Sequence, residues 1–562
     1  MGVQAACEEC GSEATVCCSS CHLGNYCSGS HCQQVWDTHR QHCCPVVERS
    51  DPTAGRFLVT SREVPAGELL LTEVAIAVGP RATSPLVCLG CHQLIPGAEF
   101  PRCAACWWPL CSEACASSSL HRAECRILAA DTSRLGQPRG PGSTPRYDVI
   151  LVLRCLLLRD TDPAAWRRLQ DMASHAKRRQ QEREQHHMTT VLYIKDVLKA
   201  DYDLQDIHHA RGAIVTNCFE WRSPSGVSLR GVYPVLGRMN HACRPTVAIT
   251  ADSEGTMWAR AAVDLQGGDH LYNTYTGTLQ TLWQRRAYTT EAHFFTCCCV
   301  RCADPTELGL HYSSPRCEQC DHQYLEPRTW LGEMTWECPM CGLQQQEQLL
   351  RQEVEQWLEH FNCDDTFLHT SPHAVRNILD KLEEVFHPHH HVWVTAAQAA
   401  IRTLQENRSR QALALKKDLW RRLLHIYDIL EPGLTRRRGV TLYEVGVAEA
   451  DIARAEKKAE DLTEYFFKLQ MQQALRHLQQ AICILSLEPP RSSERRWYDR
   501  ARDAAAAVVQ DLSGEELPDH TKQDFGGQEL PDHTKQDLDV GQCPTFLDKM
   551  QGHLPTYHII SS

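Results

Sequence analysis

Apolar side chains recur at helical spacing in two long parts of the chain. Between residues 146 and 210 they return every three or four positions, which places them on one face of a helix. The stretch 345–511 has the same period and is rich in Leu, Ala, Arg and Glu, most clearly over 412–430 and 462–485. The pattern therefore predicts a helical insert over about 146–210 and a helical domain over 345–511.

Other segments alternate apolar with polar residues and carry β-branched side chains. Residues 57–60 and 68–71 do so, and the sequence Pro-Ala-Gly at 65–67 supplies a turn between them, so the pattern predicts a β-hairpin. Short strand-like runs and turns return over 213–275. Helices and strands in separate stretches indicate an α+β fold.

The end of the sequence has neither period. A polar segment at 516–524, punctuated by Pro, recurs at 529–537, which is a repeat of 13 residues. Such a sequence does not contain enough apolar surface to form a core. We therefore predict that 512–562 is disordered.

Composition and charge narrow the class of protein. The chain has 562 residues and a net charge of −12, so it holds about two to four domains and is not a general binder of polyanions. We find no N-terminal signal peptide and no run of about 18 apolar residues, so we expect no membrane partner. A basic stretch over 167–183 is interpreted as a solvated helix face, with a contact to phosphate or to an acidic partner as the alternative.

Cysteine is abundant, with 30 residues, and much of it occurs in closely spaced pairs. In a reducing compartment such pairs indicate metal sites rather than disulfides. Four Cys or His pairs with two- or three-residue spacers hold two tetrahedral Zn²⁺ ions, and this arrangement occurs twice in the same order. The first set is Cys7, Cys10, Cys18, Cys21, Cys27, His31, His39 and Cys43, and the second is Cys88, Cys91, Cys103, Cys106, Cys111, Cys115, His121 and Cys125.

Two ligands of the first set have an adjacent alternative. Cys18 keeps the two-residue spacer to the next cysteine, whereas Cys17 does not. His31 keeps the three-residue spacer from Cys27, whereas Cys32 does not. We prefer Cys18 and His31, and Cys17 and Cys32 remain the alternatives.

Two more ligand sets follow in the middle of the chain. They are Cys297, Cys299 and Cys302 with Cys243 as a distant fourth thiolate, and the ribbon-type set Cys317, Cys320, Cys338 and Cys341. Each set supplies four ligands, and a catalytic zinc needs an open position, so we assign all of these sites to structure. Together the ligand sets predict about six zinc ions.

The first cysteine-rich segment resembles a known zinc finger. Tyr26 and Cys27, followed by Gln33, Trp36, His39 and Cys43 at their spacings, resemble a MYND finger, a cross-braced module with two zinc ions. The resemblance implies one MYND finger over 1–44 and a second over 88–125. MYND fingers mainly bind peptides, and some contact DNA.

A second segment resembles a SET domain. The hallmarks are Asn240-His241-x-Cys243-x-Pro245, then Gly268 to Leu271 and Tyr275, then the cysteine-rich segment that begins at Cys297. Together with the fingers, they resemble the SET-and-MYND (SMYD) family, and the extra finger and the segment 430–444 resemble its arthropod branch. The resemblance implies a β-rich SET domain over 45–296, split by the second finger and the helical insert. It also implies a post-SET zinc site and zinc ribbon over 297–342 and a TPR-like helical domain over 345–511.

The resemblance further implies an activity, namely S-adenosylmethionine-dependent methylation of lysine in a histone or another protein. The matching cofactor-binding positions are Gly55, Asn217, Asn240, His241, Tyr275 and Phe295. Tyr275 also matches the catalytic tyrosine that aligns the substrate amine.

Four positions depart from the family pattern. Phe57 replaces the second glycine of the first SET turn, Gly237 replaces a serine, and Thr246 replaces an asparagine. His293 stands where the family has its second channel tyrosine. Two hypotheses therefore remain open, an active lysine methyltransferase and a weak or inactive SET scaffold whose fingers recruit partners, for example in transcriptional repression.

The resemblance also sets expectations for partners. We expect a protein substrate with a target lysine, peptide partners at the fingers, a role in chromatin, and a monomer. The family's habit implies both nucleus and cytoplasm as locations.

Overall fold

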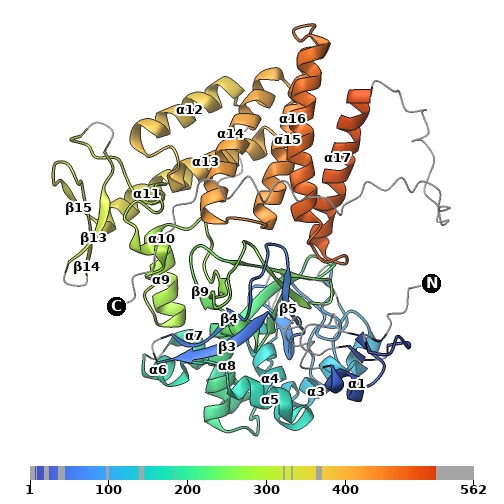
Figure 1. Cartoon of the computed structure of the whole chain (residues 1–562). Helices are drawn as coiled ribbons and strands as arrows, with labels where there is room; N and C mark the ends of the chain where they lie inside the picture. The colour runs from blue at the N-terminus through green and yellow to red at the C-terminus, as the bar shows by residue number, and fades with distance from the viewer. Residues whose placement is uncertain are drawn as a thin grey trace. The chain divides into compact units, whose positions relative to one another are not determined.

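The computed structural model is shown in Figure 1, and it describes residues 7, 9–14, 16–17, 25–35, 45–52, 54–96, 100–137, 145–182, 184–320, 323–330, 333–361 and 370–513. The described residues belong to one compact unit, which ends at residue 513. Of the predicted disordered tail, 512–562, the residues 514–562 lie outside the described residues, whereas 512 and 513 are the last two residues of α17 (Arg496–Ser513), so the prediction is wrong there. Among the helices that are described, none combines the length and the apolar character needed to cross a membrane.

The strands form several small sheets. Two of the three-stranded sheets have the orders β10-β11-β5 and β6-β8-β7, and β3 pairs with β4. The strands are β3 (Val46–Asp51), β4 (Gly55–Thr60), β5 (Leu69–Glu73), β6 (Ala77–Pro80), β7 (Cys218–Arg222), β8 (Ser228–Val232), β10 (Val247–Ala251) and β11 (Met257–Ala261). Helices and strands both contribute substantially, which confirms the expected α+β class.

A short parallel pair joins two segments that are distant in sequence. β9 (Asn240–His241) pairs with β12 (Tyr272–Asn273), and Asn240 lies opposite Tyr272. The pairing brings the Asn-His motif beside the segment that leads to Tyr275. This pairing therefore positions most of the candidate site residues.

The predicted hairpin over 57–60 and 68–71 is wrong, although both strands exist. β4 pairs along its length with β3, and β5 pairs with β11. Between β4 and β5, Val64 forms a bridge with Leu265, so the chain passes from one sheet to another. The sequence did not show this because β3 reads Val-Val-Glu-Arg-Ser-Asp and is too polar to stand out as a strand.

Helices occupy the predicted insert. They are α4 (Ile150–Thr161), α5 (Pro163–Gln170), α6 (Ala176–Gln181), α7 (Gln185–Leu192) and α8 (Leu204–Asn217). The first seven residues of α4 are all buried, because the second finger, β6 and α8 surround this helix. Tyr147, just before α4, ties the finger to the insert, since its hydroxyl donates to the Val87 carbonyl at 3.0 Å and accepts from the Val87 N–H at 2.9 Å.

The fingers and the ribbon have little regular structure. The described elements of the first finger are β1 (Val16–Cys17), β2 (Asn25–Tyr26) and α1 (Gly29–Gln34), and the second finger ends in α3 (Ser119–Leu128). The ribbon is the antiparallel sheet of β13 (Glu326–Trp330), β14 (Glu333–Glu337) and β15 (Gln344–Gln346). Short elements such as these bury little apolar area, so bound metal supplies much of the stability of such modules.

The C-terminal part of the described chain is helical. It follows α9 (Leu282–His293) and α10 (Val300–Ala303) and consists of α11 (Glu347–Phe361), α12 (Pro372–Val385), α13 (His391–Thr403), α14 (Arg410–Leu430), α15 (Arg436–Lys458), α16 (Glu464–Leu485) and α17 (Arg496–Ser513). Helices α15 and α16 approach closely at Gly446, where a Cβ atom would lie 2.8 Å from Leu478. A TPR-like repeat remains a prediction.

Gly433 fixes the junction between the strands and these helices. Its φ is +80°, and a Cβ atom there would lie 1.8 Å from the Ala262 carbonyl oxygen, so only glycine fits. The next residue, Leu434, donates its N–H to that same oxygen at 2.7 Å. This contact holds the start of α15 against the end of β11.

Candidate functional site

Five groups of Cys and His side chains gather their ligand atoms within 4.8 Å of one another in the described part of the chain. Four ligands at this spacing suit tetrahedral Zn²⁺, so the groups fit the predicted zinc. They are Cys7, Cys10, Cys27 and His31; Cys88, Cys91, Cys111 and Cys115; Cys103, Cys106, His121 and Cys125; Cys243, Cys297, Cys299 and Cys302; and Cys317, Cys320, Cys338 and Cys341. The remaining predicted ligands, Cys18, Cys21, His39 and Cys43, lie outside the described residues.

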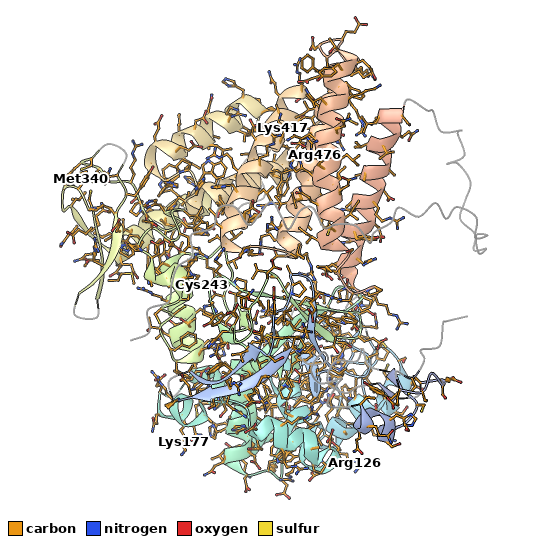
Figure 2. The ribbon with its side chains drawn as sticks, in the orientation of Figure 1. Arg126, Lys177, Cys243, Met340, Lys417 and Arg476 are labelled. Carbon is orange, nitrogen blue, oxygen red and sulfur yellow. The ribbon has the colours of Figure 1, made fainter. Side chains whose placement is uncertain are left out.

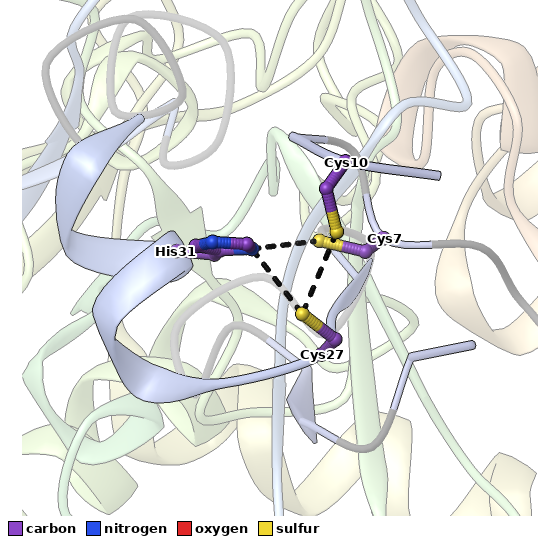
Figure 3. Close-up of side chains that lie close together, drawn as sticks. All are labelled: Cys7, Cys10, Cys27 and His31. Atoms are coloured by element: carbon purple, nitrogen blue, oxygen red, sulfur yellow. Dashed lines mark hydrogen bonds between the residues drawn. The ribbon is translucent and has the colours of Figure 1, made fainter. Parts of the chain in front are cut away.

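The first finger brings His31 into its cluster, as Figure 3 shows. The His31 Nδ1 atom lies 3.2 Å from the Cys27 sulfur and 3.7 Å from the Cys7 sulfur. The Cys10 and Cys27 sulfurs are 3.6 Å apart. The side chain of the alternative ligand, Cys32, is outside the described residues, so the structure supports His31 without excluding Cys32.

The second finger is cross-braced. Its first and third ligand pairs share one cluster, and its second and fourth pairs share the other. Behind the second cluster, the Glu124 carboxylate faces His121 Nδ1 at 3.7 Å and accepts two hydrogen bonds from Arg154, at 2.7 and 2.9 Å. Arg154 also donates to the Val78 and Leu89 carbonyl oxygens, so a buried ion pair anchors this cluster to α4.

The cluster around Cys243 is surrounded by donors instead. Cys243 follows β9 and is labelled in Figure 2, and its three partners come from the segment after α9. The Arg285 guanidinium donates to the Cys243 sulfur at 3.2 Å and to the Cys302 sulfur at 3.5 Å. Glu307 holds Arg285 in place at 2.8 Å. Cationic donors stabilise thiolates, which is the form that binds zinc.

His241 links this cluster to the segment that carries Tyr275. Its Nδ1 accepts the Tyr275 backbone N–H at 3.0 Å, and its Nε2 lies 3.3 Å from the Cys243 sulfur. Burial lowers the pKa of His241 to about 4, so the ring is neutral near pH 7. Because Nδ1 is an acceptor, Nε2 carries the proton and donates to the sulfur. Both ring nitrogens are therefore engaged within the protein, and only the backbone of His241 remains for a cofactor contact.

Tyr275 lies in the middle of a group of aromatic rings. Its hydroxyl donates to the Met239 carbonyl oxygen at 2.7 Å, and burial raises the pKa of the phenol well above its usual value. The ring centroid lies 4.6 Å from that of His293, 5.2 Å from His241 and 6.5 Å from Phe295. The structure thus brings together Tyr275 and Phe295, two residues that the sequence singled out, and both lie beside His293, the last residue of α9.

Asn240 and Gly55 are also neighbours. The Asn240 amide lies 3.5 Å from the Ala54 carbonyl oxygen, at the limit of a hydrogen bond. Gly55 has a φ of +68°, and a Cβ atom there would meet nothing within 4 Å, so its backbone is open to a ligand. Phe57 is 8% exposed, and its ring stacks on His270 with the centroids 4.4 Å apart.

Asn217 is buried at the end of α8 and is committed to the fold. Its side-chain amide donates to the Ala173 carbonyl at 2.7 Å and to the Ala213 carbonyl at 3.0 Å. Gly237 packs against it, because a Cβ atom at Gly237 would lie 3.2 Å from the Asn217 Cβ and 3.1 Å from Met172. The tight packing accounts for glycine in place of serine at this position.

Thr246 also has a structural role. Its hydroxyl accepts the Tyr272 N–H at 2.9 Å and donates to the His270 carbonyl at 3.2 Å. The side chain thereby holds β12 beside β9. No local sequence signal revealed this role, because both partners are more than 20 residues away.

The structure also contains a large groove, which the sequence did not predict. Its volume is about 960 Å³, and it is lined by β10 together with residues of α13, α14, α15 and α17. Its lining mixes aromatic rings such as Trp420, Tyr443 and Trp497 with charged side chains. The groove begins beside Asn273 and Thr274, the two residues that precede Tyr275.

Comparisons with known proteins place these features in context. No protein-family model matches the chain. The chain is 28% identical over 309 residues to the SET domain-containing protein SmydA-8, isoform B, of Drosophila melanogaster, which covers 52% of this chain and 65% of that protein. It is 23% identical over 276 residues to the N-lysine methyltransferase SMYD2-B of Danio rerio, which covers 46% of this chain and 60% of that protein.

Another similarity is to a plant protein, the histone-lysine N-methyltransferase ASHR1 of Arabidopsis thaliana, at 23% identity over 45% of this chain and 54% of that protein. Among solved structures, the SET domain of LSMT bound to lysine and AdoHcy aligns with 86% of this chain and 90% of that chain, at 13% identity and a TM-score of 0.23. A TM-score this low does not establish a common fold. The sequence relatives nevertheless agree with one another, and they confirm the resemblance of this chain to the SMYD family and to its arthropod SmydA branch.

Proposed function

We propose that the protein is an S-adenosylmethionine-dependent protein-lysine N-methyltransferase. The observation that carries the proposal is the convergence of Asn240, His241 and Tyr275 beside the four-thiolate cluster of Cys243. Two of the proteins that the chain resembles are named lysine methyltransferases of the SMYD2 type. The matched region spans about two thirds or less of those relatives, so the activity is inferred from the site as well as from the names.

Gly55 and Asn240 are the proposed contacts for the cofactor. The open backbone at Gly55 adjoins Asn240, and among the described residues the Asn240 amide makes one side-chain hydrogen bond, a long one to the Ala54 carbonyl oxygen. An amide of this kind suits the carboxylate and ammonium of an amino acid, because it both donates and accepts hydrogen bonds.

The bound cofactor would supply a methyl group on a sulfonium sulfur, and the protein must present a neutral lysine amine to it. The aromatic rings around Tyr275 exclude water, which disfavours the charged ammonium form of the lysine. The Tyr275 hydroxyl donates a hydrogen bond to the Met239 carbonyl oxygen, so the lone pairs of the Tyr275 oxygen remain to accept a hydrogen bond from an N–H of the amine. Tyr275 thus orients the amine without taking its proton.

The groove beside β12 offers a path for the rest of a protein substrate. It starts next to Asn273 and combines an edge strand, β10, with aromatic and charged side chains. An extended peptide that lies along β10 would place its lysine toward Tyr275. We propose that the MYND fingers, whose structure the zinc clusters support, bind peptide partners.

Two measurements on the purified protein test the proposal. Calorimetry should detect one S-adenosylmethionine per chain at sub-millimolar affinity, and a labelled cofactor should transfer methyl groups to histones or to a cell extract. Tyr275→Phe should lower the transfer rate by about 100-fold, a typical effect of removing one group that orients a transition state. The zinc content and the cofactor affinity of this variant should stay unchanged, which separates a catalytic loss from misfolding. An unchanged rate would show that Tyr275 is not the aligning residue.

A SET-shaped scaffold is the second candidate. It is favoured by His293 in place of a channel tyrosine and by the His241 ring, which serves the thiolate cluster rather than a ligand. This candidate predicts cofactor binding without transfer, or no binding at all. The same two measurements therefore separate the candidates.

A further inference from the structure

The groove beside β12 has an uneven charge. Its lining contains three acidic side chains, Glu431, Glu444 and Asp451. Its cationic side chains are twice as many, namely Arg402, Arg408, Lys416, Arg436, Arg437 and Arg500. The whole chain, in contrast, carries a net charge of −12. The groove is therefore a cationic surface on an anionic protein, and such a surface attracts anionic ligands.

Two of the three carboxylates are already paired inside the protein. Glu431 accepts a hydrogen bond from Arg437 at 2.8 Å. Asp451 forms salt bridges with Arg408 at 2.6 Å and with Arg454 at 3.2 Å. Because arginines of the protein hold these two carboxylates, they offer little attraction to a cation of a bound peptide.

The cations of the lining are paired less completely. Arg436 forms a salt bridge at 2.6 Å with Glu488, which does not line the groove. Lys416 is only 9% exposed, and its ammonium donates to two backbone carbonyl oxygens, each at 3.3 Å. The exposed Arg500 lies over the Trp497 ring at 5.0 Å. In the described part of the chain, neither Lys416 nor Arg500 forms a salt bridge with a carboxylate.

The third carboxylate, Glu444, lies near both of these cations. Burial raises the pKa of Glu444, and the charges of Lys416 and Arg500 oppose that increase. One carboxylate for two cations leaves a positive charge in excess. A buried lysine is seldom left without an anionic partner, so the arrangement indicates that an anionic group of a ligand completes it.

We propose that the groove binds an acidic segment of the substrate protein, so that the enzyme prefers lysines whose flanking sequence contains Asp or Glu. This inference rests on the proposed function and names the class of its substrate. Carboxylates of a segment in the groove can pair with Lys416 and Arg500. The arginine- and lysine-rich tails of histones would meet like charges there, so they are expected to be poor substrates.

Three peptides test the preference. They share one lysine and its two neighbours on each side, and their outer positions carry Glu, Gln or Arg. In calorimetry with S-adenosylhomocysteine, the Glu peptide should bind about tenfold more tightly than the Gln peptide, the combined effect of a few ion pairs, and the Arg peptide should bind most weakly. This advantage should shrink between about 0.05 M and about 0.5 M salt, because ions screen exposed charges.

Two substitutions in the groove should change the preference in opposite directions. Arg500→Glu should weaken binding of the Glu peptide about fivefold, and Glu444→Gln should strengthen it about threefold by removing a competing carboxylate. Arg476→Glu is the matched control, because Arg476 is exposed on α16, outside the groove, as labelled in Figure 2, and its affinities should equal those of the wild type. Thermal unfolding shows whether each variant is folded. If Glu444→Gln does not fold, the exposed Arg500 decides the test.

Several results would overturn the proposal. They are equal binding of the three peptides, tightest binding of the Arg peptide, and no binding of the Glu peptide. A Glu preference that neither groove variant changes would also overturn it, because the acidic segment would then bind elsewhere.

Failure of the proposed function gives a different result. In that case the labelled cofactor transfers no methyl group to any of the three peptides. The binding measurements need no turnover, and without cofactor they still compare the Glu, Gln and Arg peptides. A Glu preference that depends on Arg500 would then support an acidic partner in the groove of a protein without transfer activity.

Discussion

The His121 cluster of the second finger and the Cys243 cluster are supported by different neighbours. Behind His121, the buried pair of Glu124 and Arg154 leads into α4 and ends at backbone carbonyls. Around Cys243, Arg285 and His241 lead from the sulfur to the backbone of Tyr275. Both clusters gather ligands that suit zinc, but they support different things. The His121 cluster supports the packing of a finger, and the Cys243 cluster helps to position the candidate catalytic residue.

The largest contrast should come from removing one ligand in each cluster. Cys243→Ser should lose one zinc ion and weaken cofactor binding by about 100-fold or more, because the link to Tyr275 is lost with the metal. Cys125→Ser should also lose one zinc ion but leave the cofactor affinity of the folded protein unchanged. Elemental analysis and calorimetry measure both effects. A loss of cofactor binding in both variants would remove the distinction between the clusters.

Breaking the ion pair behind His121 should affect stability alone. Arg154→Met leaves the Glu124 carboxylate buried without its partner, which should lower the free energy of unfolding by about 3–5 kcal/mol. Chemical denaturation measures the loss, and methyl transfer per folded molecule should not change. Arg126→Met, at an exposed position of α3, is the control and should change stability by less than about 0.5 kcal/mol.

His241 should tune the Cys243 cluster. His241→Gln removes the ring that joins Tyr275 to the sulfur, and loss of such a supporting contact typically weakens metal binding by about 10–100-fold. Competition with a chelator would report this loss. The matched variant Glu124→Gln should weaken zinc binding only at the His121 cluster of the second finger. Equal losses at both clusters in either variant would contradict the separation.

The smallest effect is a pH dependence of stability. The pKa of His293 is about 4 in the folded protein, below the value of about 6.5 in an unfolded chain. Between these values the unfolded chain binds the proton and the folded protein does not, so this histidine lowers stability as pH falls from about 6.5 to about 4. In His293→Phe the free energy of unfolding should fall less steeply over the same pH range, because the variant lacks this one proton-binding group. Parallel curves for the two proteins would mean that His293 is protonated when folded.

The sequence predicted the metal clusters well because their ligands are closely spaced along the chain. Cys103 and Cys106, or Cys297 and Cys299, are set close together by local spacing alone, and the structure gathers them as expected. His31 was chosen over Cys32 on the same ground. The distant ligand Cys243 was predicted because Cys297, Cys299 and Cys302 are one thiolate short of a tetrahedron, and the structure gathers it with them.

The supporting residues were not predictable in this way. Arg154 and Arg285 are arginines in helices, and only the fold shows that one contacts a carboxylate and the other a thiolate. The hairpin prediction was wrong for the same reason. β4 pairs with the polar strand β3, although the sequence of β5 is more typical of a strand. The contacts of the His241 ring with the Tyr275 backbone and the Cys243 sulfur were likewise not predictable from any local pattern.

The most direct test of the central claim is a calorimetric titration of S-adenosylmethionine into the zinc-loaded protein. The claim is that Asn240, Tyr275 and the Cys243 cluster form one cofactor site. It predicts one binding event per chain at sub-millimolar affinity, which disappears when the zinc of the Cys243 cluster is removed. Absence of binding to the zinc-loaded protein, or binding that is indifferent to that zinc, would contradict it.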